Sequence, residues 1–419
     1  MKPSSPKQEQ VEDSVFVARQ PIFRKTKKVF GYELLFRSGQ ENFADPSIDG
    51  DIATSNVVTN SFLVIGLAKL TDGKKAFINF TDEMLCNSSP ALFPREAIVV
   101  EVLEDVVVTP QLIKSCRSLV SQGYVLALDD FIYKPEFDPL LKLAGIVKFD
   151  IRAMSMAELA RDVERVAPFR VRLLAEKVET QEEFEATKEM GFNLFQGYFF
   201  CKPEIVGGRD IPASKIQYLQ LLRMVQDENY NFEKISDLIS HNVALSFKLL
   251  RYVNSAYIGL RNKVKSLQTA VALIGELNIR KWLSLIMLSH MAEDKPLELV
   301  KLSIERASFC GRIGDSLPDK RFDGSLFFTV GMFSLLDVIL GQKMEAILKD
   351  LNLADEIQDC LLGRSRDQLA RTLTLVKAYE RGNWEKVSQL SSALGVPMGD
   401  LPGHFDDVLE EVRAFCLGD

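Results

Sequence analysis

The sequence has few of the residues from which soft-metal and redox sites are built. It contains three histidines in 419 residues, none before His241, and the residues that follow them are Asn242, Met291 and Phe405. A metal centre built on a His-Asp pair is therefore excluded. The six cysteines are scattered without a CxxC pair, so we expect reduced thiols rather than a zinc site or a disulfide framework.

Membrane and nucleic-acid signals are also absent. No apolar run approaches the roughly 18–20 residues that span a bilayer. Residues 1–14 (MKPSSPKQEQVEDS) are polar, which predicts a disordered leader rather than a signal peptide. With 51 Lys and Arg against 58 Asp and Glu, the net charge of −7 argues against a general nucleic-acid-binding surface. We expect a cytoplasmic protein that binds neither membrane nor nucleic acid.

Residues 15–205 alternate short apolar runs with segments of helical period, the pattern of a parallel sheet. Eight strand candidates in about 200 residues predict a modified (β/α)8, TIM-like barrel. They are residues 15–18, 29–36, 76–80, 97–102, 124–128, 146–149, 172–175 and 195–199. The first two are separated by about ten residues, too few for a helical crossover, so we expect them to pair antiparallel.

Polar residues occur at the ends of seven of these strands. They are Glu33 with Arg37, Asn79, Glu101 with Glu104, Asp129 with Asp130, Lys148 with Asp150, Glu176 with Glu179, and Gln196. Taken singly, each could be a solvated strand end or half of a local ion pair. Together they predict a site, because the carboxyl ends of barrel strands meet at the face where active sites form.

The residue types at these ends suit phosphoryl chemistry. Glu33, Asn79, Glu101 and Asp129 form an all-oxygen set suited to Mg²⁺ or Mn²⁺, which can activate water and stabilise charge on a phosphoryl group. Lys148 and Glu176 could orient or deprotonate that water. The fork of donors on an arginine such as Arg37 suits a phosphate oxygen.

Short motifs in this region carry a family resemblance. They are Gln20-Pro-Ile22, Tyr32-Glu-Leu-Leu-Phe-Arg37, Phe77-Ile-Asn79, Glu101-Val-Leu-Glu104, Asp129-Asp-Phe131, Lys148-Phe-Asp150, Ala175-Glu-Lys-Val-Glu-Thr180 and Gln196-Gly-Tyr198. In this order they resemble the EAL domain, the family of cyclic di-GMP phosphodiesterases, which folds as a modified barrel.

The resemblance implies a role for each matching residue. The implied metal ligands are Glu33, Asn79, Glu101, Asp129 and Asp130, and the implied catalytic residues are Lys148 and Glu176, acting on the attacking water. The implied substrate-binding residues are Gln20, Arg37, Asp150, Glu179 and Gln196, and Glu104 is implied to support a loop.

The sequence also departs from the family pattern. Leu34 replaces the alanine of the naming motif, and Leu103 replaces a threonine that helps to anchor a neighbouring loop. Ile132 and Lys134 replace the glycines of the loop after the paired aspartates, which removes backbone freedom near the metals. Lys177 also replaces a glycine. These changes predict a degenerate site that binds the nucleotide weakly or not at all and turns over slowly or not at all.

The second half reads as entirely helical. A Gly- and Pro-punctuated linker at 206–213 precedes a helical domain at 214–419, with a helix expected across Gly324–Leu340. Leu249-Leu-Arg-Tyr-Val-Asn-Ser255 and Val264–Gly275 resemble an HDOD domain, a relative of HD-type phosphohydrolases, over about 214–340. Without a His-Asp pair we expect no metal here. Arg251, Asn254 and Ser255 could form a ligand surface or a hydrogen-bonded helix end.

Three functional hypotheses remain open at this stage. The first is a signalling protein in which a degenerate EAL domain senses cyclic di-GMP, or has lost even that, and an HDOD module binds a protein partner. The second is a working Mg²⁺- or Mn²⁺-dependent phosphodiesterase that produces linear pGpG. The third is a protein scaffold. The EAL resemblance also implies a homodimer.

Overall fold

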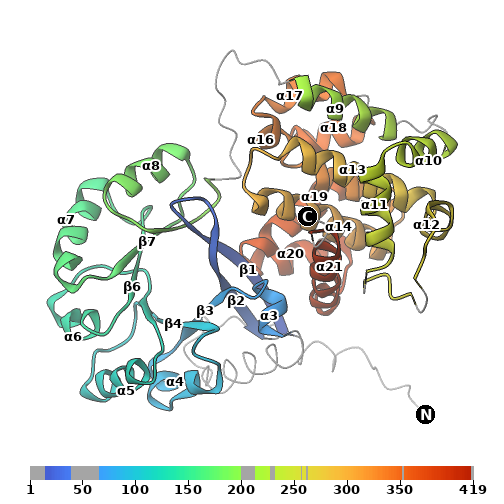
Figure 1. The fold of residues 1–419 in the computed structure, drawn as a ribbon. Coiled ribbons are helices and arrows are strands. Elements are labelled where there is room, and N and C mark those ends of the chain that lie inside the picture. Colours follow the sequence, from blue (N-terminus) through green and yellow to red (C-terminus); the bar gives the residue numbers. More distant parts are fainter. Residues whose placement is uncertain are drawn as a thin grey trace, which may run out of the picture. The chain divides into compact units, whose positions relative to one another are not determined.

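The computed structural model describes residues 15–38, 66–199, 213–226, 232–255, 257–260, 263–351 and 353–416. The chain forms two compact units, whose elements are labelled in Figure 1. The first unit comprises Met1–Lys202 together with Ala378–Ser388, and the second comprises Pro203–Lys377 with Gln389–Asp419. Sequence analysis assigned 378–388 to the helical half, so the structure adds a distant segment to the first unit.

Eight strands close into a barrel in sequence order, which confirms the predicted fold class. They are β1 (Val15–Arg24), β2 (Val29–Ser38), β3 (Lys75–Phe80), β4 (Ile98–Val102), β5 (Leu126–Leu128), β6 (Ile146–Asp150), β7 (Arg172–Glu176) and β8 (Leu194–Gln196). The first strand pairs antiparallel with both β2 and β8, and all other pairs are parallel. The expected antiparallel start is therefore confirmed.

Helices connect the parallel strands. They are α3 (Leu67–Leu70), α4 (Asp82–Cys86), α5 (Pro110–Ser121), α6 (Asp138–Leu141), α7 (Met156–Val166) and α8 (Gln181–Glu189), with short 3-10 turns at Ser89–Leu92, Pro135–Phe137 and Ala167–Phe169. Capping boxes start α7 and α8, because a Ser or Thr and the Glu three residues later satisfy each other's backbone amides. The capping boxes therefore fix where the helices that follow β6 and β7 begin.

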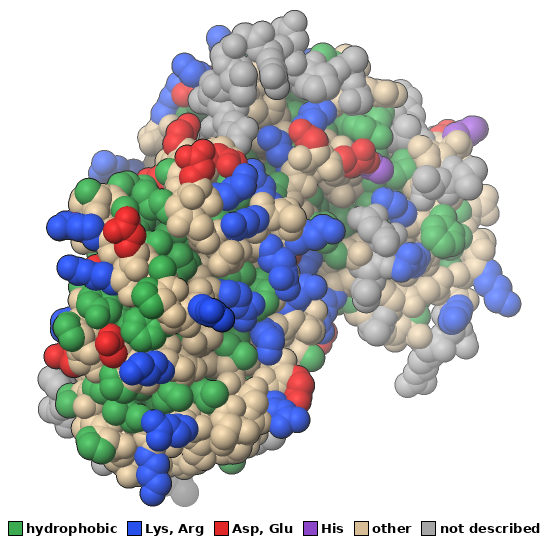
Figure 2. Space-filling model, turned by 60° about the vertical axis from the view of Figure 1, so that its left-hand side comes forward, with side chains coloured by type: hydrophobic (Ala, Val, Ile, Leu, Met, Phe, Trp, Pro, Cys, Tyr) green, Lys and Arg blue, Asp and Glu red, His purple; other side chains and the backbone are tan. Residues whose placement is uncertain are grey.

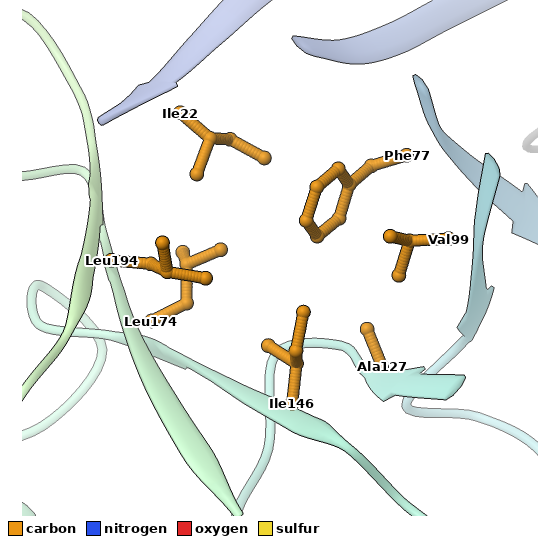
Figure 3. Close-up of a cluster of buried hydrophobic side chains, with 7 residues drawn as sticks. All are labelled: Ile22, Phe77, Val99, Ala127, Ile146, Leu174 and Leu194. Atoms are coloured by element: carbon orange, nitrogen blue, oxygen red, sulfur yellow. The ribbon is translucent and has the colours of Figure 1, made fainter. Parts of the chain in front are cut away.

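The barrel interior is packed with apolar side chains. Figure 3 shows one layer of them pointing inward from seven strands. Its members are Ile22, Phe77, Val99, Ala127, Ile146, Leu174 and Leu194, each at most 2% exposed. The interior is therefore a core rather than a pore, and any site must lie above it at one end of the strands.

Aromatic side chains attach the segment 378–388 to the barrel. The rings of Tyr379 and Trp384 have centroids 5.1 Å apart, and Trp384 lies 5.9 Å from Phe16 of β1. Gly382 has a φ of 65°, and a Cβ at this position would lie 2.7 Å from Cδ1 of Leu35. The left-handed φ favours glycine here, and a Cβ would have to displace the Leu35 side chain.

We expect the substitution Tyr379→Ala to lower the free energy of unfolding by about 3–5 kcal/mol, the cost of removing a large ring from a packed site. Tyr379 is fully buried. Chemical denaturation of the full chain measures the change. Tyr379→Phe keeps the ring and serves as the control, with a loss smaller than that of the alanine variant. Equal stability of the wild type and the alanine variant would show that the segment does not support the barrel.

The second unit is helical. Its described helices are α9 (Ala213–Gln226), α10 (Phe232–Ser240), α11 (Val243–Val253), α12 (Leu267–Ile274), α13 (Glu276–Met291), α14 (Leu297–Ser316), α15 (Gly324–Phe333), α16 (Leu336–Leu340), α17 (Met344–Asp350), α18 (Asp355–Leu361), α19 (Gln368–Glu380), α20 (Trp384–Leu394) and α21 (Leu401–Cys416). Parts of α19 and α20 group with the barrel. None of the described helices has the length and apolar character needed to cross a membrane.

Two details of this unit differ from or refine the sequence analysis. The single helix expected across Gly324–Leu340 is wrong, because the chain breaks at Ser334 and Leu335 between α15 and α16. Asn254 ends α11, and its side-chain amide donates to the carbonyls of Leu250 and Val264 while its oxygen accepts from the Val264 amide. These contacts favour the reading of Asn254 as a hydrogen-bonded helix end.

Candidate metal centre at the barrel rim

The site residues form the layer directly above the apolar core. On six parallel strands the site residue follows a core residue by two positions: Phe77 and Asn79, Val99 and Glu101, Ala127 and Asp129, Ile146 and Lys148, Leu174 and Glu176, and Leu194 and Gln196. On β1, which is antiparallel to its neighbours, the site residue Gln20 precedes the core residue Ile22 by two positions. Because strand side chains alternate with period two, both layers face the interior. We call this upper layer, together with Glu33, the rim.

Lys148 lies at the centre of the rim. Its Nζ contacts four carboxylates from β2, β4, β7 and the end of β5, at 2.7 Å from Glu101, 2.7 Å from Asp129, 2.9 Å from Glu176 and 3.5 Å from Glu33. The Lys148 side chain is fully buried, and no carboxylate in the set is more than 12% exposed. Their low exposure distinguishes these groups from the charged side chains on the surface, which Figure 2 shows interspersed with hydrophobic ones.

Burial and mutual attraction set the ionisation of this cluster. Burial alone lowers the pKa of Lys148, but the surrounding carboxylates outweigh it and raise that pKa well above its ordinary value. Burial raises the pKa of Glu101 and of Glu176 well above the usual range, and the Lys148 ammonium only partly opposes it. When fully ionised, four carboxylates and one ammonium carry a net charge of −3, so the rim favours further cations.

Amide side chains complete the rim. Gln196 Nε2 donates to Gln20 Oε1 at 3.0 Å and to Glu33 Oε2 at 2.5 Å, which links β8, β1 and β2. The Oδ1 of Asn79 and the Oε1 of Gln196 are buried and have no hydrogen-bond partner among the described residues. A buried oxygen without a donor is costly in a folded protein, so these atoms are suited to receive a ligand.

Two groups of carboxylates have oxygen atoms close enough to share a cation. The first carboxylate group is Glu33, Glu101 and Asp129, and the second is Asp129, Asp130 and Glu176; within each, ligand atoms lie within 4.8 Å of one another. Asn79 pairs in register with Glu101 on neighbouring strands, so its free oxygen lies beside the first group. An all-oxygen set of this kind fits hard divalent cations such as Mg²⁺ and Mn²⁺.

The backbone is unusual where β5 and β7 end. Asp130 has a φ of 38° and Lys177 a φ of 55°, a region that residues with a Cβ rarely adopt. The ammonium of Lys177 pairs with Asp150 Oδ2 at 2.6 Å, and the backbone amide of Arg152 donates to Asp150 Oδ1 at 2.8 Å. Asp150 is thus held by partners on both oxygens.

Two of the remaining predicted residues, Glu104 and Glu179, lie outside this tight cluster. Glu179 is exposed and pairs with Arg152 at 3.2 Å, and Glu104 is exposed after β4. The backbone of Arg37 lies in β2, opposite Phe16, but its side chain is outside the described part of the structure. Glu104 and Glu179 are therefore available at the surface beside the rim rather than within it.

Three of the five residues that depart from the EAL pattern line a pocket of about 190 Å³ beside Asp129 and Asp130. Its wall includes Leu103, Ile132 and Lys134. Lys134 is exposed, and its Nζ lies 5.9 Å from the ring centroid of Phe137.

The sequence predicted which residues gather at the rim but not how they pair. Lys148 is predicted to act on the attacking water, and Lys177 is noted as the replacement of a glycine. The structure adds the pairing of both side chains: Lys148 contacts four carboxylates, and Lys177 pairs with Asp150. Arg152 was not singled out, although its position two residues after Asp150 is a signal that could have identified it.

Comparison with known proteins agrees with this architecture. Family models match an EAL domain at residues 65–203 and an HDOD domain at residues 211–374. The chain is 37% identical to the uncharacterized protein YuxH of Bacillus subtilis, over 91% of this chain and 94% of that protein. It is 36% identical to the cyclic di-GMP phosphodiesterase CdgJ of Vibrio cholerae, over 93% of this chain and 90% of that protein.

Among solved structures, an EAL domain protein from Listeria monocytogenes is 19% identical, with 48% of this chain and 94% of that chain covered and a TM-score of 0.35. A likeness this low adds nothing to the assignment, which depends on the two domain matches and the two full-length relatives. The chain belongs to the family of proteins that join an EAL domain to an HDOD domain.

Proposed function

We propose that the rim is a divalent-metal-dependent phosphodiesterase site that hydrolyses cyclic di-GMP slowly, and that the HDOD domain binds a protein partner. The observation that carries the proposal is the convergence of four carboxylates, none more than 12% exposed, on the Lys148 ammonium, with a net charge of −3 when all are ionised. The name of the relative CdgJ supports cyclic di-GMP as the substrate.

The residues present fit Mg²⁺ or Mn²⁺. Glu33, Asn79, Glu101 and Asp129 would hold one ion, and Asp129, Asp130 and Glu176 would contribute to a second. A bound divalent ion would lower the pKa of a coordinated water and neutralise charge on the phosphoryl oxygens. The unpartnered Oδ1 of Asn79 supports this fit, because a metal ligand needs a free lone pair.

The side chains of the rim would also orient the attacking water, accept its proton and position Glu33. Lys148 and Glu176 lie 2.9 Å apart; Lys148 would orient the attacking water, and Glu176 would accept its proton. Gln196 fixes Glu33 through its amide, and Gln20 receives the second hydrogen of that amide. Water adds to phosphorus, the bond to one ribose oxygen breaks, and that oxygen takes a proton, leaving linear pGpG.

Slow turnover is expected because of the loop after Asp130. Ile132 is 57% exposed and Lys134 is exposed, so neither is anchored in the core. The side chains of Ile132 and Lys134 narrow the pocket beside the proposed metal ligands. The loop also lacks the glycines whose backbone freedom would let it close. The alternative function is binding of cyclic di-GMP without turnover, which Lys148 favours because its ammonium already neutralises part of the carboxylate charge.

Incubation of the full chain with cyclic di-GMP and Mg²⁺ or Mn²⁺ tests the proposal. We expect linear product, separated by chromatography, from the wild type and none above background from Glu33→Ala, because that variant lacks an oxygen ligand of the first carboxylate group. Product from both proteins would point to a contaminant. No product from either, with saturable binding of the nucleotide by the wild type, would favour the sensor function.

A further inference from the structure

Lys177 stands out among the cations near the rim because it holds an unfavourable backbone conformation and contacts a site residue. It follows Glu176 directly at the end of β7 and has a φ of 55°. Its Nζ lies 2.6 Å from Asp150 Oδ2, with the Lys177 side chain 57% exposed and that of Asp150 11% exposed. Strained residues of this kind gather at functional sites when surrounding contacts hold them in place.

The charges around Lys177 are those of the second carboxylate group. Asp150 pairs in register with Glu176 on the neighbouring strand, so the ammonium bound to Asp150 Oδ2 lies beside one member of this group. Glu176 also precedes Lys177 directly in the chain, and it shares the second carboxylate group with Asp129 and Asp130. Lys148, by contrast, contacts members of both groups.

We propose that Lys177 is a built-in monovalent cation that opposes the second divalent ion, so that the rim fills one metal position tightly and the other weakly. This inference rests on the proposed function, because it assumes that the rim binds divalent cations at all. A fixed positive charge repels an incoming ion of charge +2, and holding Asp150 in an ion pair keeps that carboxylate from turning toward the metal.

The expected size of the effect follows from Coulomb's law. The Lys177 side chain is largely exposed, so its field is screened much as in water, where a monovalent and a divalent cation about 6 Å apart change the affinity of the second ion on the order of tenfold. Because Lys177 is largely exposed, added salt should screen the repulsion and shrink the difference.

Isothermal titration of the metal-free full chain with Mn²⁺, without nucleotide, measures both affinities. For the wild type we expect one tight and one weak event. Lys177→Gly should tighten the second event about tenfold and leave the first nearly unchanged. Lys177→Arg keeps the charge and should behave like the wild type. Repeating the titration in high salt should reduce the gain of the glycine variant.

Arg170→Gly provides a matched control. Arg170 is also an exposed cation with a left-handed φ, of 57°, but it precedes β7 at the end of the strand opposite the rim. This variant removes the same charge and relieves the same backbone strain. It should leave both Mn²⁺ affinities unchanged, so a gain equal to that of Lys177→Gly would overturn a local role for Lys177.

Two other results separate this inference from the proposed function. If the wild type and Lys177→Gly bind two Mn²⁺ ions with the same affinities, the inference is wrong while the metal-dependent site stands. If neither protein nor the control binds Mn²⁺, both the inference and the proposed metal site are wrong. Electron paramagnetic resonance of the same samples distinguishes single ions from coupled pairs and checks the stoichiometry independently of activity.

Discussion

Replacement of Lys148 by Met is expected to destabilise the metal-free protein by about 3–5 kcal/mol, the cost of breaking a buried ion pair by removing one partner. The substitution keeps an unbranched side chain of similar length, so little volume is lost. It leaves Glu33, Glu101, Asp129 and Glu176 without the ammonium that all four contact. Denaturant unfolding in the presence of a chelator measures the loss. Lys142→Met, at an exposed lysine after α6, is the control and should change stability little.

The same variant should respond to metal more than the wild type does. A cation that binds only the folded state raises stability in proportion to the logarithm of its concentration over its dissociation constant. Without the Lys148 ammonium the carboxylates attract Mn²⁺ more strongly, so we expect millimolar Mn²⁺ to restore much of the lost stability. Unchanged stability of the metal-free variant would show that Lys148 does not neutralise the carboxylates in solution.

Glu101→Gln is expected to keep the stability of the metal-free protein and to lose affinity for Mn²⁺, the reverse of Lys148→Met. Glu101 is fully buried, and burial raises the pKa of its carboxyl group. Since burial already disfavours the ionised form of this carboxyl group, a neutral amide of the same shape should leave the metal-free protein as stable as the wild type or more stable. The affinity for Mn²⁺ should fall by at least about 100-fold, since even outer-shell changes cost 10–100-fold.

Thermal unfolding with and without Mn²⁺ measures both parts of this expectation. Glu136→Gln, which neutralises an exposed carboxylate in the 3-10 turn Pro135–Phe137, is the matched control and should keep the wild-type response to Mn²⁺. If Glu101→Gln kept that response as well, Glu101 would not be a ligand. A large loss of stability without metal would instead mean that its charge is needed to hold Lys148.

Much of the barrel could be predicted from the sequence because its strands are short apolar runs separated by helical segments. The position of the rim could be predicted as well. The side chain of a polar residue two positions after a core residue, such as Glu101 after Val99, faces the barrel interior like that of the core residue. The pairing of Lys148 could not be predicted. It depends on how the curved sheet brings β6 opposite β2, and sequence spacing carries no information about that distance.

Other differences have local causes. The break between α15 and α16 falls within an apolar run that contains no proline, so period alone could not locate it. The segment 378–388 carries ordinary helical patterns on both sides of Gly382. Its place in the barrel unit depends on Trp384, which lies beside Tyr379 and meets Phe16, a residue more than 350 positions away. Pairings at such separation leave no local signal.

Anomalous diffraction from crystals of the full chain grown with Mn²⁺ tests the central claim most directly, because it locates the ion without reference to turnover. We predict a manganese peak bound by Glu33, Asn79, Glu101 and Asp129, with the Lys148 ammonium moved away from at least one of these carboxylates. The absence of a manganese peak at millimolar Mn²⁺ would contradict this prediction if Lys148 also remained within ion-pair distance of all four carboxylates. The Lys148 ammonium, rather than a metal ion, would then be the cation of the rim.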